Sequence, residues 1–162
     1  MSISKRLKFI AGLVTPGYRA VDVGTDHGYV PVFLLREGIC PGAIAVDVSE
    51  GSLQKAIDLG RRAGLEGKLD CRLSDGLRNV QPGEADCIII SGMGGILMRR
   101  ILEEGLETVL SAKELILSPH RNPELILEFL ELHGFFLTAD EFIEDKKRGY
   151  RVFKARKNVP ES

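Results

Sequence analysis

Short apolar runs alternate with stretches of helical hydrophobic spacing along most of the chain. A short run of apolar positions bounded by turn residues indicates a strand that is covered on both faces. Strands are predicted at residues 20–23, 43–46, 69–73, 86–90 and 114–117. Helices are predicted from Ser2 or Ser4 to Leu13, and over residues 31–36, 49–64, 93–111 and 123–133. This alternation predicts a parallel sheet with helices on both faces.

The pattern changes after residue 134. Two strand-like segments, 135–143 and 150–155, follow each other with only residues 145–149 between them. A connection this short permits only an antiparallel pair. Five strand and helix units followed by a hairpin are similar to the sheet of class I methyltransferases, whose last strand is antiparallel. We therefore predict an α/β, Rossmann-like fold with a seven-stranded, mostly parallel sheet, helices on both faces and a C-terminal antiparallel β-hairpin.

Length and composition fit a single globular domain. The chain has 162 residues, of which 44% are hydrophobic and 28% charged, enough to form a core. No apolar run approaches the roughly 20 residues that span a bilayer, and the N-terminus lacks the apolar region of a signal peptide. These features predict a cytoplasmic protein without a membrane segment.

A net charge of −1 creates no long-range field that would attract nucleic acid. A nucleic-acid partner would therefore have to bind a local basic patch. The densest patch consists of Lys146, Lys147, Arg148, Arg151, Lys154, Arg156 and Lys157. Its alternative interpretation is a solvated hairpin edge whose charges prevent aggregation.

The three cysteines, Cys40, Cys71 and Cys87, are far apart and form no C-x-x-C pattern. The three histidines make no ligand cluster with them. Because metal and redox sites need such spacing, we predict reduced thiols and no metal site.

Residues 21–31 form a glycine-rich turn between a predicted strand and helix, with the carboxylate of Asp26 at its centre. A dinucleotide-binding turn keeps that position free of anions, because the pyrophosphate lies against its backbone N–H groups. The turn suits a cationic ligand, and S-adenosylmethionine carries a sulfonium and an α-ammonium. Glycines let the backbone approach its methionine moiety. The cofactor-binding residues predicted in this turn are Asp22, Gly24, Asp26, His27 and Gly28.

Other strand ends carry suitable residues, and ligands of open α/β sheets bind at these ends. Asp47 is placed to accept hydrogen bonds from the ribose hydroxyls. Asp75 is placed to accept the exocyclic amine of adenine, while the N–H groups of Gly76 and Leu77 meet a ring nitrogen. The remaining predicted cofactor contacts are Val48, Ser91, Gly92 and Met93.

These features also have structural interpretations. The pair Asp75-Gly76 is a turn signal, and Asp22 can accept N–H groups of its own turn. The pair His133-Gly134 is typical of a helix end, and Met93 of a core. Four strand ends in the expected order favour the cofactor interpretation.

The chain closely resembles the bacterial tRNA (adenine-22-N1)-methyltransferase family in the order and spacing of three motifs. They are Asp22-Val-Gly24-Thr-Asp26-His27-Gly-Tyr29-Val-Pro31, Asp75-Gly76-Leu77 and Ile90-Ser-Gly92-Met93-Gly94-Gly95. The resemblance covers residues 3–156. It implies methyl transfer from S-adenosylmethionine to N1 of an adenine in tRNA.

The resemblance implies that Asp26 is the catalytic residue near the transferring group. Adenine N1 attacks with an in-plane lone pair, so catalysis needs in-line positioning and stabilisation of the positive charge that arrives on the ring. A carboxylate can bind the N6 amine and stabilise or deprotonate the product. The turn at residues 91–95 replaces the N-P-P-[YF] motif of N6-adenine enzymes, which disfavours N6 methylation. The implied substrate-binding residues are Met93, Gly94, His120, Asn122, Lys147 and Tyr150.

Two segments depart from the family pattern. Residues 118–122 read Ser-Pro-His-Arg-Asn in place of Gln-Pro-Asn or Ser-Pro-Gln, and the Glu-Asp-Gly-Lys-x-Tyr segment is one residue longer at 144–150. The family usually adds a C-terminal helical domain. We expect a methyltransferase domain over residues 1–157, a frayed tail at 158–162 and no such helical domain. The oligomeric state is not predicted.

Three alternatives remain open at this stage. The chain can be a methyltransferase that acts on a small molecule or a protein. It can also be a catalytically silent module that binds S-adenosylmethionine or RNA. A dinucleotide-dependent oxidoreductase is the least favoured, because Asp26 opposes phosphate binding.

Overall fold

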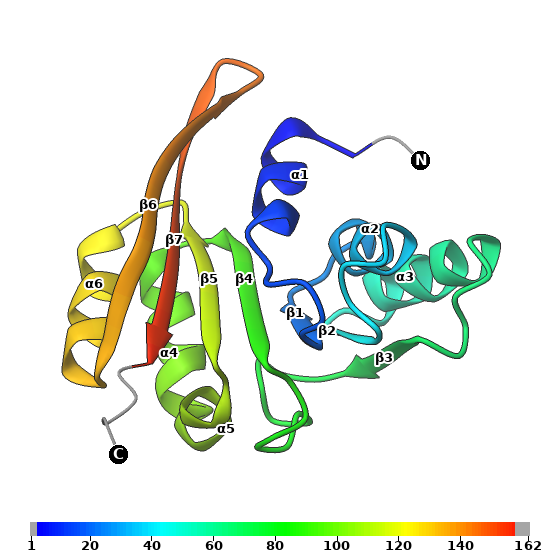
Figure 1. The fold of residues 1–162 in the computed structure, drawn as a ribbon, viewed down its shortest axis with the longest axis horizontal. Helices are drawn as coiled ribbons and strands as arrows, with labels where there is room; N and C mark the ends of the chain where they lie inside the picture. Colours follow the sequence, from blue (N-terminus) through cyan, green and yellow to red (C-terminus); the bar gives the residue numbers. More distant parts are fainter. Residues whose placement is uncertain (1–2, 158–162) are drawn as a thin grey trace.

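The computed structural model describes residues 3–157 and confirms the predicted α/β fold (Figure 1). Its elements are α1 (Lys5–Gly12), β1 (Ala20–Val23), α2 (Tyr29–Arg36), β2 (Ala43–Asp47), α3 (Glu50–Arg62), β3 (Leu69–Leu73), β4 (Cys87–Met93), α4 (Gly95–Glu104), α5 (Leu106–Ser111), β5 (Glu114–Pro119), α6 (Pro123–Leu132), β6 (Phe135–Asp145) and β7 (Arg148–Lys157). The tail predicted at 158–162 lies outside the described residues.

Seven strands form one sheet in the order β3-β2-β1-β4-β5-β7-β6. The pairs from β3 to β5 are parallel, whereas β7 is antiparallel to both of its neighbours, β5 and β6. The predicted C-terminal antiparallel hairpin is therefore confirmed. Parallel strands bring their carboxyl ends to one edge, which is where the site described below lies.

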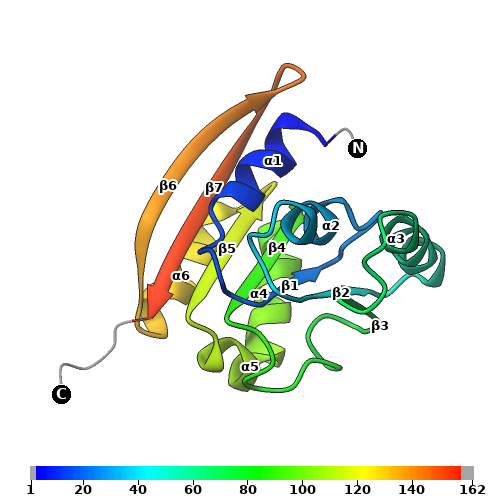
Figure 2. The ribbon, with the colours of Figure 1, turned by 45° about the vertical axis from the view of Figure 1, so that its right-hand side comes forward.

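Helices cover both faces of the sheet, as Figures 1 and 2 show. Alternate residues of β4 point in opposite directions, so Ile88 and Ile90 pack with Met98 of α4 while Ile89 packs with Ile10 of α1 on the other face. All of these side chains are buried. A strand that is buried on both faces has to be apolar throughout, which explains why the central strands read as continuous apolar runs.

The predicted helix over 93–111 is wrong in two respects. The strand before it continues to Met93, and its pairing with β5 shifts register between Ser91 and Met93. The helix itself is broken at Gly105, where an added Cβ would lie 2.8 Å from the Cβ of Leu77. The turn between α4 and α5 therefore packs so closely against the β3–β4 connection that residue 105 has no room for a side chain.

The hairpin is longer and its turn tighter than predicted. Its two turn residues, Lys146 and Lys147, have φ values of 51° and 66°, and Asp145 pairs with Arg148. Positive φ at both central residues matches the right-handed twist of the strands. The hairpin tip lies beside α1 in Figures 1 and 2, where the Arg6 backbone N–H donates to Asp145 Oδ2 at 3.0 Å.

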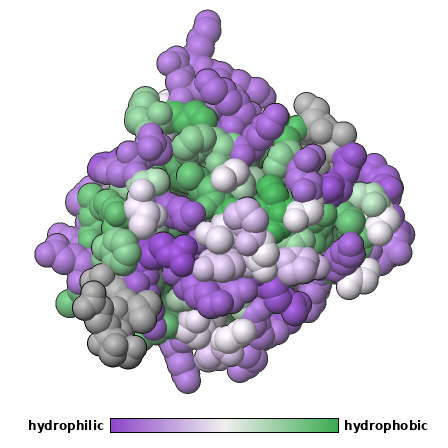
Figure 3. Space-filling view, in the orientation of Figure 1, coloured by the Kyte–Doolittle hydropathy of each residue, from purple (hydrophilic) through white to green (hydrophobic). Residues whose placement is uncertain are grey.

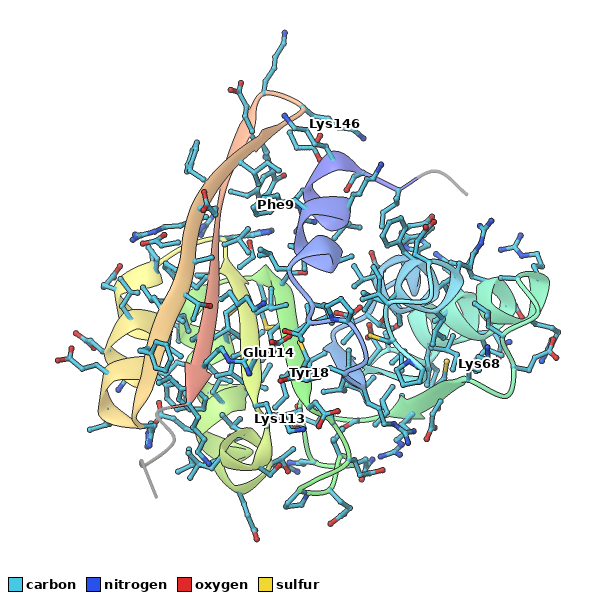
Figure 4. The ribbon with its side chains drawn as sticks, viewed as in Figure 1. Phe9, Tyr18, Lys68, Lys113, Glu114 and Lys146 are labelled. Atoms are coloured by element: carbon cyan, nitrogen blue, oxygen red, sulfur yellow. The ribbon has the colours of Figure 1, made fainter. Side chains whose placement is uncertain are left out.

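The fully buried carboxylate of Glu114 joins three parts of the fold at the amino end of β5. It accepts hydrogen bonds from the Thr15 backbone N–H at 3.0 Å and from Thr15 Oγ1 at 2.6 Å. Arg156 Nη1 lies 3.2 Å away and Lys154 Nζ 3.7 Å away, both on β7. Glu114 lies far from the hairpin tip marked by Lys146 (Figure 4), so this network is structural.

No helix within residues 3–157 has both the length and the apolar character needed to cross a bilayer. The same residues contain no group of three or more His, Cys, Asp or Glu side chains arranged to hold a metal ion.

Candidate active site at the carboxyl ends of the strands

A cavity of about 310 Å³ opens at the carboxyl ends of β1 and β4. The turn after β1 forms one wall, the last residues of β4 and the turn after β5 form another, and α1 and α2 close the rest. Its lining residues are Arg6, Leu7, Asp22, Gly24, Thr25, Asp26, Tyr29, Val30, Ser91, Gly92 and His120. Six residues of the predicted site therefore meet in one place: Asp22, Gly24, Asp26, Ser91, Gly92 and His120.

The turn after β1 is fastened to the end of β2. The N–H groups of Gly24 and Thr25 donate to the Val46 carbonyl at 2.9 and 3.0 Å, and the Asp26 N–H donates to Asp47 Oδ2 at 2.9 Å. Gly24 has a φ of 71°, and an added Cβ there would lie 3.3 Å from Met93 Cε. The backbone of the turn is thus held rigidly against β2.

Asp26 lies at the mouth of the cavity. Its φ of 57° is a left-handed conformation that Asp tolerates better than most residues. With its backbone held by Asp47, its side chain stays 70% exposed, and Oδ2 lies 3.0 Å from His27 Nδ1. A carboxylate is therefore presented where a substrate would enter.

Asp22 lies deeper in the cavity and is 5% exposed. Thr25 Oγ1 donates to its Oδ2 at 2.9 Å. Burial raises the pKa of Asp22 to about 7, with the nearby Asp47 carboxylate acting in the same direction, while the Thr25 hydrogen bond and Arg6 oppose the shift. A cation bound beside Asp22 would favour its ionised form.

Asp47 and Val48 form an adjoining surface at the end of β2. Asp47 is nearly buried, and its oxygens accept from Asp26 N and, at 2.9 Å, from Ser49 N. Each carboxylate oxygen can accept a further hydrogen bond. Val48 is 73% exposed although it is apolar. A hydrogen-bond acceptor beside an exposed aliphatic side chain suits a ribose with its attached base.

The turn after β3 lies elsewhere. Asp75, Gly76 and Leu77 line a separate cavity of about 320 Å³ between the β3–β4 connection and the helices α4 and α5. Leu77 is buried in the core, and the Arg78 N–H donates to the Asp75 carbonyl at 3.3 Å. This turn therefore does not line the cavity at β1.

His27 and Gly28 do not line the cavity at β1 either. The His27 ring stacks on Tyr29 at 5.3 Å between centroids and lines a cavity of about 260 Å³ against α3. Gly28 has a φ of 80°, and an added Cβ would lie 2.7 Å from Ala56 Cβ. A side chain at residue 28 would therefore collide with α3, so the close packing of α2 and α3 requires glycine at this position.

A second cavity of about 350 Å³ adjoins the first, and His120 lines both. Its other lining residues are Pro119, Arg121, Arg148, Gly149 and Tyr150. The His120 and Tyr150 rings lie 5.7 Å apart. Burial, followed by the charges of the nearby arginines, lowers the pKa of His120, so it is neutral at neutral pH. Two arginines without a lining carboxylate make this cavity suitable for an anion.

The remaining predicted substrate residues line neither cavity. Asn122 precedes α6 with a φ of 51°, and its Nδ2 donates to Glu124 Oε1 at 3.3 Å. Lys147 is exposed at the hairpin tip. Met93 packs against the core, and its carbonyl accepts from the His120 N–H at 2.9 Å. Gly94 is the residue that precedes α4.

Two cavity residues from α1, Arg6 and Leu7, were not predicted as site residues. The Arg6 side chain reaches over the Tyr150 ring, with Cζ 4.7 Å from the ring centroid. No spacing rule connects α1 to β7, so the pattern carries no signal for this contact.

Comparisons with known proteins match the chain to methyltransferases. A family model described as "Methyltransferase domain" matches residues 3–153. The tRNA (adenine(22)-N(1))-methyltransferase of Bacillus subtilis is 33% identical over 155 residues, which are 96% of this chain. The match covers 65% of that relative, so the chain spans slightly less than two thirds of its length.

Solved structures give the same result. The B. subtilis M1A22 tRNA methyltransferase TrmK superimposes with a TM-score of 0.93 at 32% identity, covering 97% of this chain and 67% of TrmK. Streptococcus pneumoniae Sp1610 in complex with S-adenosyl-L-methionine has a TM-score of 0.93 at 36% identity, covering 99% of this chain and 76% of Sp1610.

Proposed function

The chain belongs to the tRNA (adenine(22)-N(1))-methyltransferase family, and on that premise we propose that it transfers a methyl group from S-adenosylmethionine to N1 of an adenine in tRNA. Position 22 is implied by the names of these relatives. The observation that supports this function most is the pair of carboxylates on one cavity, with Asp22 buried inside it and Asp26 exposed at its mouth.

The residues present fit S-adenosylmethionine. Asp47 has free acceptor capacity for the ribose hydroxyls, and Val48 offers an aliphatic surface to the adenine ring. Asp22 provides a carboxyl group for the α-ammonium inside the cavity. When bound, this cofactor supplies an electrophilic methyl group on a sulfonium.

Asp26 is the residue that we assign to the reaction itself. Adenine N1 needs no proton removed before it attacks, because its lone pair lies in the ring plane. As positive charge develops on the ring, a carboxylate at the cavity mouth can accept a hydrogen bond from the N6 amine and stabilise that charge. The fixed backbone of Asp26 keeps the carboxylate at the mouth, which reduces the reorganisation required.

The second cavity is the proposed binding site for the target nucleotide. His120 and Tyr150 offer aromatic surfaces to a base, and Arg121 and Arg148 offer guanidinium groups to a flanking phosphate. Enzymes that modify a base have to expose it and hold its backbone, so this combination suits an extruded nucleotide.

The β6–β7 hairpin extends this basic surface. Its tip forms a hydrophilic projection in Figure 3, and Lys146 marks the tip in Figure 4. Lys147 and Arg148 are also exposed there. We propose that the tip contacts phosphates of tRNA, while Met93, Gly94 and Asn122 shape the turns beneath the target base. A tRNA substrate also supports a cytoplasmic location.

The test is transfer of labelled methyl groups from S-adenosylmethionine to bulk tRNA, followed by nucleoside analysis. We expect the label in 1-methyladenosine. Asp26→Asn should lower kcat about 100-fold or more without weakening cofactor binding, whereas Glu66→Gln, a change at an exposed carboxylate in the turn after α3, should have no effect. Label found at N6 or on protein would contradict the proposal, and absence of transfer with intact cofactor binding would indicate a silent module.

A further inference from the structure

Arg6 lines the cavity at β1 and carries a polar atom that the protein leaves without a partner. Its Nη1 is buried and has no hydrogen-bond partner among residues 3–157. The guanidinium lies over the Tyr150 ring, and the backbone N–H of Arg6 is bonded to Asp145. Both contacts fix the position of Arg6 without satisfying Nη1. A buried donor left without an acceptor is rare in folded proteins, and here it belongs to a guanidinium whose residue lines a cavity, where a ligand can supply an acceptor.

The protein does not neutralise this charge itself. Asp22 and Asp26 line the same cavity, yet none of the ion pairs within residues 3–157 involves the Arg6 side chain. The cavity therefore presents a carboxyl group and a guanidinium group as separate charges. This is the complement of an amino-acid zwitterion, in which an ammonium and a carboxylate are attached to one carbon.

The order of groups along the sheet agrees with this interpretation. Asp47 ends β2 and Val48 follows it, Asp22 is on the neighbouring β1, and Arg6 lies beside Tyr150 of β7, which is on the other side of β1 in the sheet order. A ligand with its ribose at Asp47 and its ammonium at Asp22 would extend its carboxylate toward Arg6.

We propose that Arg6 binds the α-carboxylate of the cofactor's methionine moiety and so determines specificity for a ligand that retains this group. The inference rests on the proposed use of S-adenosylmethionine. Arg6 is then a cofactor-binding residue contributed by α1, and α1 must be docked against β7 for the cofactor to bind tightly. Binding to a tRNA phosphate is the competing role for the same guanidinium, and the test below separates the two.

Isothermal titration calorimetry with three ligands tests the proposal. S-adenosylhomocysteine keeps both charges, 5′-deoxy-5′-(3-aminopropylthio)adenosine keeps the amine and lacks the carboxylate, and 5′-methylthioadenosine lacks both. A charge-assisted hydrogen bond predicts that the protein binds the first about 10- to 100-fold more tightly than the second. Arg6→Gln should remove this preference and leave the affinity for the second ligand within about twofold. Arg6→Lys should restore part of it.

The matched control is Lys8→Gln, at an exposed cation on the same helix, which should change neither affinity. Equal losses for the first two ligands in Arg6→Gln would show a structural role and overturn the proposal. The proposal would also be overturned if Arg6→Gln kept the normal ligand preference and had a raised KM for tRNA. That result would assign Arg6 to RNA binding. The preference of the unmodified protein tests the proposal even if Arg6→Gln does not fold. Failure to bind any of the three ligands would instead refute the proposed function.

Discussion

Asp22 should make cofactor affinity depend on pH across the neutral range. Burial raises the pKa of this carboxyl group to about 7 from 3.8. A ligand ammonium needs the ionised carboxylate, so binding near pH 6 should release close to one proton. Between pH 7.5 and pH 5.5 the ionised fraction falls from about three quarters to about 3%, so the Kd for S-adenosylhomocysteine should rise about 25-fold.

The raised pKa of Asp22 also affects the stability of the ligand-free protein, which falls as pH rises, whereas the cofactor affinity increases. The folded state holds the proton up to about pH 7, whereas the unfolded chain releases it near pH 3.8. Stability therefore falls as pH rises between these values, and the loss is complete above pH 7. Asp22→Asn removes this penalty, and at pH 8 it should unfold with a free energy higher by up to about 4 kcal/mol.

Calorimetry in buffers of different ionisation enthalpy measures the affinity and the protons released together. 5′-Methylthioadenosine, which lacks the ammonium, should show no dependence in the same range. Asp22→Asn should bind S-adenosylhomocysteine weakly, and its Kd should not show the 25-fold rise between pH 7.5 and pH 5.5. The variant keeps the other charged or titratable groups of the site, namely His120, Asp26, Asp47 and Arg6. A constant Kd in the unmodified protein, or an unchanged slope in Asp22→Asn, would refute the reasoning.

Three further predictions concern stability and RNA. Glu114→Ala leaves the cations of Lys154 and Arg156 without their buried partner and should lower the free energy of unfolding by about 3 kcal/mol in urea titrations; an effect under about 1 kcal/mol would contradict the network. Gly28→Ala should cost about 3 kcal/mol, since the methyl group meets Ala56 at 2.7 Å in a left-handed backbone; a stable variant would contradict this packing. Replacing Lys146 and Lys147 together by Gln should reduce the slope of log K for tRNA against log salt by about 2, with cofactor affinity unchanged; an unchanged slope would show that the tip is only a solvated edge.

Most of the fold could be predicted because its signals are local. The apolar runs of β4 and β5 and the short connection between β6 and β7 determine a parallel sheet with a terminal hairpin. The two-residue turn was missed because Lys146 and Lys147 are not the usual residues for positive φ. The close packing of Gly105 against Leu77 has no local signal, because it joins residues far apart in the sequence.

The candidate site divides in the same way. Asp22, Asp26 and Asp47 could be placed from the sequence, since each lies at or just after the end of a strand that its own pattern predicts. Arg6 could not, because its position depends on how α1 packs beside β7. Asp75 followed the strand-end rule too, yet the β3–β4 connection turns toward α4 and α5 and carries it to another cavity.

Mapping the modified nucleotide tests the central claim most directly. A methyl group on N1 blocks Watson–Crick pairing, so reverse transcription of treated tRNA should stop at position 22, the position named in the relatives. The stop should disappear when that adenine is replaced by guanine, and also with Asp26→Asn. Methyl incorporation without a stop, or a stop elsewhere that persists after the replacement, would contradict the account.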